Sequence, residues 1–432
     1  SPRKKRALLL RIPYFCSMRI NKLRLKNFRL FQDLEIDFGN SNITASIGIN
    51  GAGKTSILDA ISKALSSIMS DVNLQTHGQD FLSNSDILKG ETSTSIEASF
   101  SLDGETINVN CNWSIDGNRQ NTVDNTGELI KNRLPLMVYY RVNRTSSIPV
   151  FAKSMISDRV SAMYSSALEA NVSAFSKFEG WFINELNLEN EYKVSKADHL
   201  YELDSLRNVR NAFKKFLSIV GENSITDIRI DRDAKSTDFN LDNEPYAVVI
   251  KNGDRLRFNQ LSSGERMVMY LVSDIARRLT FSAQNDENTI NGSGIVLIDE
   301  LDLHLHPAWQ KTIVQALKNT FPNVQFIVTT HAPLILSTLR PENILALSDG
   351  NVISKENLPK VFSGTADEVF EELMNVKPYM MDFDSEKQEL DILYNNFQLD
   401  EAEKKLKQLK HRIDSNAEWI VNYEKRIAFA KT

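Results

Sequence analysis

A lysine and a threonine close a glycine-rich octapeptide near the start of the chain. Residues 48–55 read Gly-Ile-Asn-Gly-Ala-Gly-Lys-Thr, a GxxxxGK[ST] pattern in which backbone N–H groups and the amino end of the following helix face phosphate oxygens. An empty glycine turn would not explain the lysine. We therefore predict that Lys54 holds the β- and γ-phosphates of ATP and that Thr55 holds Mg²⁺. The predicted contacts of the nucleotide in this loop are Asn50, Gly51, Ala52, Gly53, Lys54, Thr55 and Ser56.

Two acids end an apolar run further along the chain. Residues 294–300 read Gly-Ile-Val-Leu-Ile-Asp-Glu, as expected of a buried parallel strand that delivers charge to its carboxyl end. A buried strand followed by a solvated turn has the same pattern, but the phosphate loop upstream favours a catalytic interpretation. We expect Asp299 to bind Mg²⁺ through water and Glu300 to polarise the attacking water.

A histidine ends the next apolar strand. Residues 324–331 read Val-Gln-Phe-Ile-Val-Thr-Thr-His. A single histidine is usually a satisfied structural residue, so this assignment depends on its neighbours. Because His331 follows the acidic strand, we predict that it donates a hydrogen bond to the γ-phosphate.

The order of these motifs resembles that of the ABC-type ATPases, in the soluble branch with structural-maintenance, Rad50-like and RecF-like proteins. Leu261–Glu265 is similar to the family's signature motif, Leu301-Asp302 to its D-loop, and His331 to its switch histidine. The resemblance implies an α/β head, with a doubly wound, mostly parallel sheet and an antiparallel β subdomain. In that family the signature of one subunit caps the nucleotide of the other. The residues expected to act in trans are Ser262, Ser263 and Gly264.

Within that branch, residues 261–339 look like stand-alone ATPases of bacterial antiphage defence, nearest to the PtuA ATPases of Septu systems. This resemblance implies a head-to-tail homodimer, in a higher oligomer, that controls a separate HNH nuclease subunit of the PtuB type. ATPases of PARIS and retron systems share the motif order and stay open as alternatives. A DNA-repair or chromosome-associated ATPase that binds DNA directly is a further alternative.

Composition limits the kinds of DNA contact, cysteine chemistry and membrane association that the chain can have. The 432 residues carry a net charge of −5, so any DNA contact must come from a local patch or from the partner. With only Cys16 and Cys111, neither a disulfide framework nor a cysteine metal site is available, and a reducing cytoplasm is expected. The sequence contains no run of about 18 apolar residues, so we predict no membrane-spanning helix.

A row of cations follows Met18, where we expect the fold to start. In residues 21–29, Leu23 and Leu25 face one side of a predicted strand, and Lys22, Arg24 and Lys26 face the other. Such a row could contact nucleic-acid phosphates. It could equally form a solvated edge that discourages sheet pairing.

Patterning divides the chain into five segments. These are an extension outside the fold (1–17), an amino-terminal ATPase lobe (18–150), a helical insert (151–225), a carboxy-terminal ATPase lobe (226–362) and a tail of amphipathic helices (363–432). Helices this short are not stable alone in water, so they must pack against other helices, the ATPase head or a partner. We interpret the tail as an oligomerisation or partner-docking module, and packing onto its own head is the alternative.

Three other features concern a metal site, a nuclease centre and the Q-loop residue. The histidines of residues 303–307 (Leu-His-Leu-His-Pro) lack a third metal ligand nearby, so a structural contact is expected. Asp382-Phe383-Asp384 is similar to the acidic pair of a TOPRIM nuclease, but the required Glu-Gly strand end is missing before it, and we predict no nuclease centre in this chain. Gln79 and Asp86 are the candidates for the family's Q-loop residue.

Overall fold

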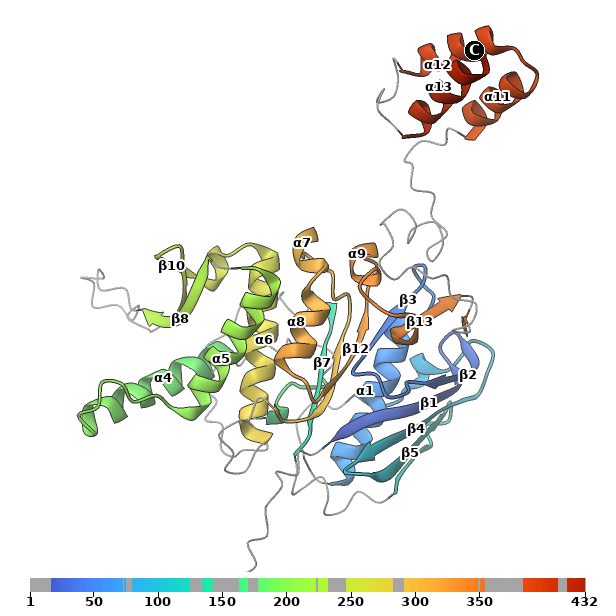
Figure 1. The fold of residues 1–432 in the computed structure, drawn as a ribbon. Coiled ribbons are helices and arrows are strands. Elements are labelled where there is room, and N and C mark those ends of the chain that lie inside the picture. The colour runs from blue at the N-terminus through green and yellow to red at the C-terminus, as the bar shows by residue number, and fades with distance from the viewer. Residues whose placement is uncertain are drawn as a thin grey trace, which may run out of the picture. The chain divides into compact units, whose positions relative to one another are not determined.

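The computed structural model describes residues 17–72, 74, 80–124, 134–142, 163–169, 178–222, 224–231, 246–282, 291–348, 350–353, 384–410 and 418–431. The chain divides into two compact units, Ser1–Met374 and Asn375–Thr432. The two units are described separately below (Figure 1).

A six-stranded sheet forms the centre of the first unit. Its strands lie in the order β14-β13-β3-β12-β11-β7, and every pair is parallel except β13 with β14. β3, β7, β11 and β12 are buried along their whole length, which explains their almost continuous apolar sequence. The bounds are β3 (Ile43–Ile47), β7 (Leu136–Tyr140), β11 (Gly294–Ile298), β12 (Val324–Thr329), β13 (Ile344–Ser348) and β14 (Asn351–Val352).

This strand order brings the predicted motifs to one edge of the sheet. β12 lies between β3, which leads into the phosphate loop, and β11, which leads into Asp299. Because the three strands are parallel, their carboxyl ends meet at the same edge, where open α/β sheets bind their ligands. The strands predicted before the loop, before the acidic pair and before His331 are confirmed.

Helix α1 (Lys54–Asp71) packs between the parallel sheet and a second, antiparallel one (Figure 1). The second sheet has the order β2-β1-β4-β5-β6. α1 is buried along nearly its whole length, as expected of a helix covered on both sides. The bounds are β1 (Met18–Phe28), β2 (Phe31–Asp37), β4 (Ser93–Leu102), β5 (Glu105–Ser114) and β6 (Arg119–Val123).

A helical region and a small sheet form the other side of the first unit. α5 packs on α6 and α8, and α4 packs on β9 of the three-stranded sheet β10-β9-β8. Phe178 of α4 contacts Phe258 and Tyr270, so aromatic side chains join the insert to α6. The bounds are α4 (Phe178–Ser195), α5 (Asp204–Val220), α6 (Ser263–Ser282), α7 (Pro307–Gln310), α8 (Ile313–Thr320), α9 (Pro333–Leu336), β8 (Ile225–Asp231), β9 (Tyr246–Lys251) and β10 (Asp254–Arg257).

The second unit contains three described helices, α11 (Asp384–Asn395), α12 (Leu399–Lys410) and α13 (Glu418–Lys431). They bury a small apolar core of their own, which includes Leu406, Trp419 and Ile420. The amphipathic helices predicted for residues 363–432 are therefore confirmed at these three ranges, whereas residues 363–383, 411–417 and 432 lie outside the described residues.

Among the described residues, none of the helices is long and apolar enough to cross a membrane. The segment boundaries predicted at residues 150, 225 and 362 stay predictions.

Candidate nucleotide site

Glycines shape the phosphate loop for two different reasons. Gly48, Gly51 and Gly53 have φ values of 151°, 84° and 98°, which a residue with a side chain rarely adopts. At Gly53 space is limiting as well, because a Cβ atom there would lie 2.3 Å from Cζ of Phe31. α1 starts directly after Gly53. The amino end of this 18-residue helix therefore opens onto the loop, as anion binding requires.

Lys54 lies over the loop that it is predicted to serve. Its ammonium donates hydrogen bonds to the carbonyl oxygens of Gly48 (2.8 Å) and Ile49 (3.0 Å). Burial lowers the pKa of this ammonium, and the carboxylates of Asp299 and Glu300 offset part of that effect. The side chain is thus held in place beside the position predicted for the phosphates.

The threonine of the loop and the acid of β11 lie in direct contact. Oγ1 of Thr55 donates to the Asp299 carboxylate, 3.1 Å from either oxygen, and Asp299 is 3% exposed. A hydroxyl and a carboxylate are the oxygen ligands that Mg²⁺ accepts, with water and phosphate completing its shell. No cluster of three or more metal-binding His, Cys, Asp or Glu side chains occurs within the described ranges. These residues therefore fit Mg²⁺ bound together with a nucleotide and do not fit a metal held by protein alone.

Thr329, at the end of β12, joins the two acids. Its hydroxyl donates to Asp299 (2.6 Å) and accepts a hydrogen bond from the backbone N–H of Glu300 (2.7 Å). Glu300 itself has φ of 49°, in the left-handed region that a non-glycine residue adopts only when its surroundings enforce it. The turn after β11 is therefore held by its neighbours. Thr329 was not among the residues predicted for the site, although a hydroxyl at the end of an apolar strand is a signal that the sequence shows.

His331 faces the same cavity and is connected to the D-loop. Its backbone N–H donates to Asp302 (3.1 Å), which also accepts a hydrogen bond from the hydroxyl of Thr330 (2.7 Å). Burial, followed by the nearby Lys54 ammonium, holds the pKa of His331 below its usual value of 6.5. The imidazole is therefore neutral at pH 7, with one N–H to donate.

These groups line one cavity of about 200 Å³. Besides the predicted residues it includes Leu30, which the sequence analysis missed and which lies in the turn between β1 and β2. Ala52, a residue of the loop predicted to contact the nucleotide, is buried and does not line the cavity. The lining residues are Leu30, Asn50, Gly51, Gly53, Lys54, Thr55, Ser56, Asp299, Glu300, Thr329 and His331.

The signature residues lie outside this cavity. Ser262 caps the start of α6, where its hydroxyl donates to Glu265 (2.8 Å) and also accepts from the backbone N–H of Glu265 (3.3 Å). A Cβ atom on Gly264 would lie 2.3 Å from the carbonyl oxygen of His304. Gly264 therefore lets α6 pack closely against the segment that follows the D-loop in its own chain. Ser262 and Ser263 stay exposed.

Asp86 is unsuitable as a phosphate sensor. It is 1% exposed and forms ion pairs with Arg29 (3.0 Å) and Lys63 (3.3 Å). Arg29 also pairs with Asp59 of α1 (2.6 Å), and Arg141 pairs with the same Asp59. This network joins the first turns of α1 to the end of β7. The other Q-loop candidate, Gln79, lies outside the described residues.

The predicted cation row has a different setting from either interpretation in the sequence analysis. β1 is not an edge strand, because it pairs with β2 on one side and β4 on the other. Its alternation is confirmed, but Arg24 pairs with Asp33 (2.9 Å) and Lys26 lies 3.6 Å from Glu97. Lys22 stands opposite Asp37 in the register. Cross-strand acids thus balance the row.

The alternating histidines have structural surroundings. The Nδ1 atom of His306 accepts a hydrogen bond from the backbone N–H of Ala308 (3.2 Å) at the start of α7, and the His304 carbonyl contacts α6. Asp382 and Phe383 lie outside the described residues, as does the side chain of Asp384.

Comparisons with known proteins agree with this geometry. One family model, described as an AAA ATPase domain, matches residues 18–215, and another, whose description names an AAA domain and the AbiEii toxin of type IV TA systems, matches residues 140–337. The strand order, loop and acidic strand end thus define an ABC-type P-loop ATPase.

Among curated proteins, the chain is 33% identical to the "Retron Vc95 probable ATPase" of Vibrio cholerae serotype O1 biovar El Tor, over 77% of this chain and 74% of that protein. It is 28% identical to the "Septu protein PtuA" of Bacillus mycoides (strain KBAB4), over 74% of this chain and 39% of that protein. The chain belongs to the family of antiphage-defence ATPases that includes the retron Vc95 protein.

Among solved structures, an Smc head bound to the C-winged helix domain of ScpA is 18% identical, with a TM-score of 0.47 over 77% of this chain and 97% of that one. The fold assignment depends on the strand order described above, not on this partial likeness.

Proposed function

We infer that this ATPase is the regulatory subunit of a defence complex of the retron or Septu type, which dimerises head-to-tail around ATP and controls an associated HNH nuclease. This proposal is supported by the separation of the phosphate-loop cavity from the signature motif within one chain. The cavity holds the groups for phosphate, metal and water, whereas the signature caps its own helix and lines no part of that cavity. A second copy would bring the missing signature to the nucleotide.

Each residue then has a specific role. Lys54 holds the β- and γ-phosphates, and Thr55 and Asp299 hold Mg²⁺, which neutralises charge on the phosphates. Glu300 polarises the attacking water, and neutral His331 donates to the γ-phosphate. Ser262, Ser263 and Gly264 of the second copy contact the same nucleotide from the opposite side. Hydrolysis would separate the two copies and so change the state of whatever is attached to them.

The relatives support the defence role and a choice between systems. Identity and coverage are both higher for the retron Vc95 protein than for PtuA of Bacillus mycoides. A retron-type system, which ranked as an alternative to Septu in the sequence analysis, therefore has the stronger support. The helices of Asn375–Thr432 are the proposed docking module for the nuclease partner.

Direct DNA binding through β1 has little support. Its cations face carboxylates on β2 and β4, so they would have to break ion pairs to contact phosphates. Any DNA contact would come from elsewhere or from the partner.

Light scattering tests the composite site. With Mg²⁺ and ATP, Glu300→Gln is expected to trap a nucleotide-bound dimer, whereas Lys54→Ala, which lacks the phosphate contact, stays monomeric or keeps only nucleotide-independent association. Glu105→Gln, the same chemical change at an exposed residue, is the control. If Glu300→Gln binds ATP without a change in mass, the composite site is wrong.

Partner docking has its own test. A chain ending at Met374 should lose recovery of the nuclease subunit in a pull-down, while it keeps nucleotide binding. Equal recovery by the full and shortened chains would refute the docking role.

A further inference from the structure

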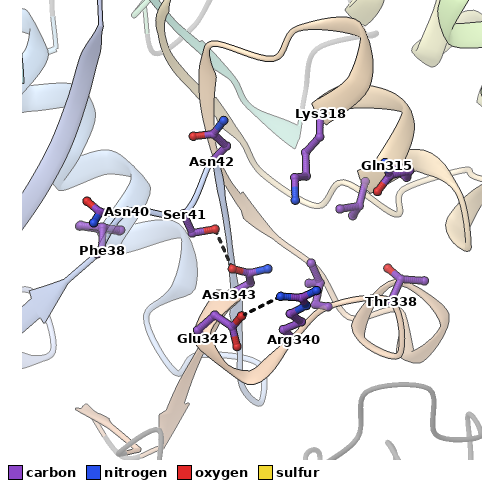
Figure 2. A pocket seen from close by; sticks show the side chains of 13 residues that line it. Phe38, Asn40, Ser41, Asn42, Gln315, Lys318, Thr338, Arg340, Glu342 and Asn343 are labelled. Atoms are coloured by element: carbon purple, nitrogen blue, oxygen red, sulfur yellow. Dashed lines mark hydrogen bonds and ion pairs between the residues drawn. The ribbon is translucent and has the colours of Figure 1, made fainter. Parts of the chain in front are cut away.

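A second, larger cavity lies at the opposite end of β3 from the nucleotide loop (Figure 2). Its volume is about 710 Å³. Three segments line it: the loop 38–42 before β3, the outer face of α8, and residues 338–343 after α9. None of the motifs considered above contributes to it. β3 is five residues long, so about 17 Å separates the two ends of this strand.

One wall of the cavity is rigidly built. The hydroxyl of Ser41 lies 2.6 Å from Oδ1 of Asn343, and the amide nitrogen of Asn42 donates to the carbonyl of Pro322 (2.7 Å). The guanidinium of Arg19 donates to Oδ1 of Asn42 and to the carbonyl of Ser41. The loop before β3 is thus fixed by partners on both sides and does not need a ligand to order it.

Hydrogen-bond donors converge on the space beside this wall. Asn343 is only 9% exposed, and because its Oδ1 accepts from Ser41, its amide nitrogen points away from Ser41 toward the cavity (Figure 2). The ammonium of Lys318 points into the same space from α8 (Figure 2). Lys318 makes no ion pair or hydrogen bond with any residue that the structure describes.

The third donor is loosely held. Arg340 and Glu342 form an ion pair at 3.8 Å, and their side chains are 71% and 57% exposed. An exposed pair at that distance contributes little energy, so an incoming anion can compete for the guanidinium. The lining therefore carries two cations and one carboxylate, together with a buried amide donor.

We propose that this cavity binds a phosphate group. A phosphate accepts hydrogen bonds from ammonium, guanidinium and amide donors at once, and charge-assisted bonds of this kind are the strong ones. Phe38 is the aromatic residue of the lining and is 3% exposed, so it offers no face on which a base could stack. The chemistry thus recognises the phosphate itself, either free or at the end or backbone of a nucleic-acid strand.

Lys318 could also stabilise α8, and the test must distinguish this role from phosphate binding. It lies in the last turn of α8, where a cation also offsets the helix dipole. Its removal would then change the stability of the protein but not its affinity for phosphate.

Fluorescence anisotropy tests the proposal on the full chain carrying Lys54→Ala, which removes phosphate binding at the nucleotide loop. The probes are a labelled single-stranded oligodeoxynucleotide with a 5′-phosphate and the same strand with a 5′-hydroxyl, and inorganic phosphate is the competitor. Lys318→Ala and Arg340→Ala, both at the surface, and Asn343→Asp should each weaken binding about tenfold. Lys89→Ala, at an exposed residue remote from this cavity, should leave it unchanged.

The probes also distinguish the sources of the phosphate. Preference for the 5′-phosphate indicates a strand end, and equal binding of both strands indicates a backbone phosphate. If neither strand binds but inorganic phosphate raises the melting temperature in a Lys318-dependent manner, the ligand is a free phosphate. If all effects of phosphate and both strands are the same with and without Lys318, the proposal is wrong, and the composite ATP site is untouched by that result.

Discussion

The two halves of the proposed ATP site are built in opposite ways. The phosphate-loop half is enclosed, and its polar groups are bonded to one another: Thr55 to Asp299, Asp299 to Thr329, and Thr329 to Glu300. In the signature half Ser262 and Ser263 are exposed, and among the described residues the side chain of Ser262 bonds to Glu265 at the start of its own helix. The first half is preorganised for its ligand. The signature residues of the second half do not line the nucleotide cavity of their own chain.

A close contact between Gly264 and His304 connects the two halves. Gly264 packs against the carbonyl of His304, and the preceding Asp302 accepts bonds from Thr330 and His331. A partner that presses on the signature would therefore act on the segment that holds the switch histidine.

The largest effect is expected from Lys54→Ala. It removes the ammonium over the loop, so nucleotide binding should be lost in isothermal titration. Lys22→Ala, which removes an exposed cation of β1 outside the nucleotide cavity, is the control. Undiminished ATP affinity of the Lys54 variant would show that the loop does not bind the phosphates.

Glu300→Gln should keep ATP binding and stop turnover. The amide fills the same space but cannot polarise water, so steady-state hydrolysis should fall by about 100-fold or more. Hydrolysis at the unmodified rate would mean that Glu300 is not the base.

Gly264→Ala should separate the two halves. The added methyl group would lie 2.3 Å from the His304 carbonyl, which we expect to destabilise the protein by about 1–3 kcal/mol and to slow hydrolysis more than it weakens ATP binding. Gly180→Ala is the matched control, because its Cβ atom would meet nothing within 4 Å. Chemical denaturation measures the change in stability, and ATPase assays measure the change in hydrolysis rate. Equal behaviour of the two variants would rule out a tight joint at Gly264.

The smallest effect concerns pH. The pKa of His331 is lowered in the folded protein from its usual 6.5, so the unfolded chain takes up the proton first. Stability should therefore fall as the pH drops below 6.5, and His331→Gln should reduce that fall. An NMR titration of His331 with a midpoint above 6.5 would contradict this expectation.

Local patterns were sufficient to predict the glycine-rich loop before a helix, the acidic end of a buried strand and the position of His331 after the next strand, because each is a short segment. The roles of these residues stay predictions. The insertion of β12 between β3 and β11 was not predicted, since strand order depends on packing between distant segments. The pairing of the β1 cations was missed for the same reason: Asp33 and Glu97 come from two different strands. Asp86 looked available in the sequence because its partner Arg29 lies 57 residues away.

A mixing experiment tests the central claim most directly. Lys54→Ala should be inactive because it cannot hold ATP, and Ser262→Arg should be inactive because its bulky cation blocks the approach of the signature to a partner's nucleotide. In a mixed dimer, the loop of the Ser262 variant meets the intact signature of the Lys54 variant. We predict that combining the two inactive proteins restores ATP hydrolysis. If every mixing ratio stays inactive while each variant remains folded, the nucleotide site is not shared between two copies of this chain.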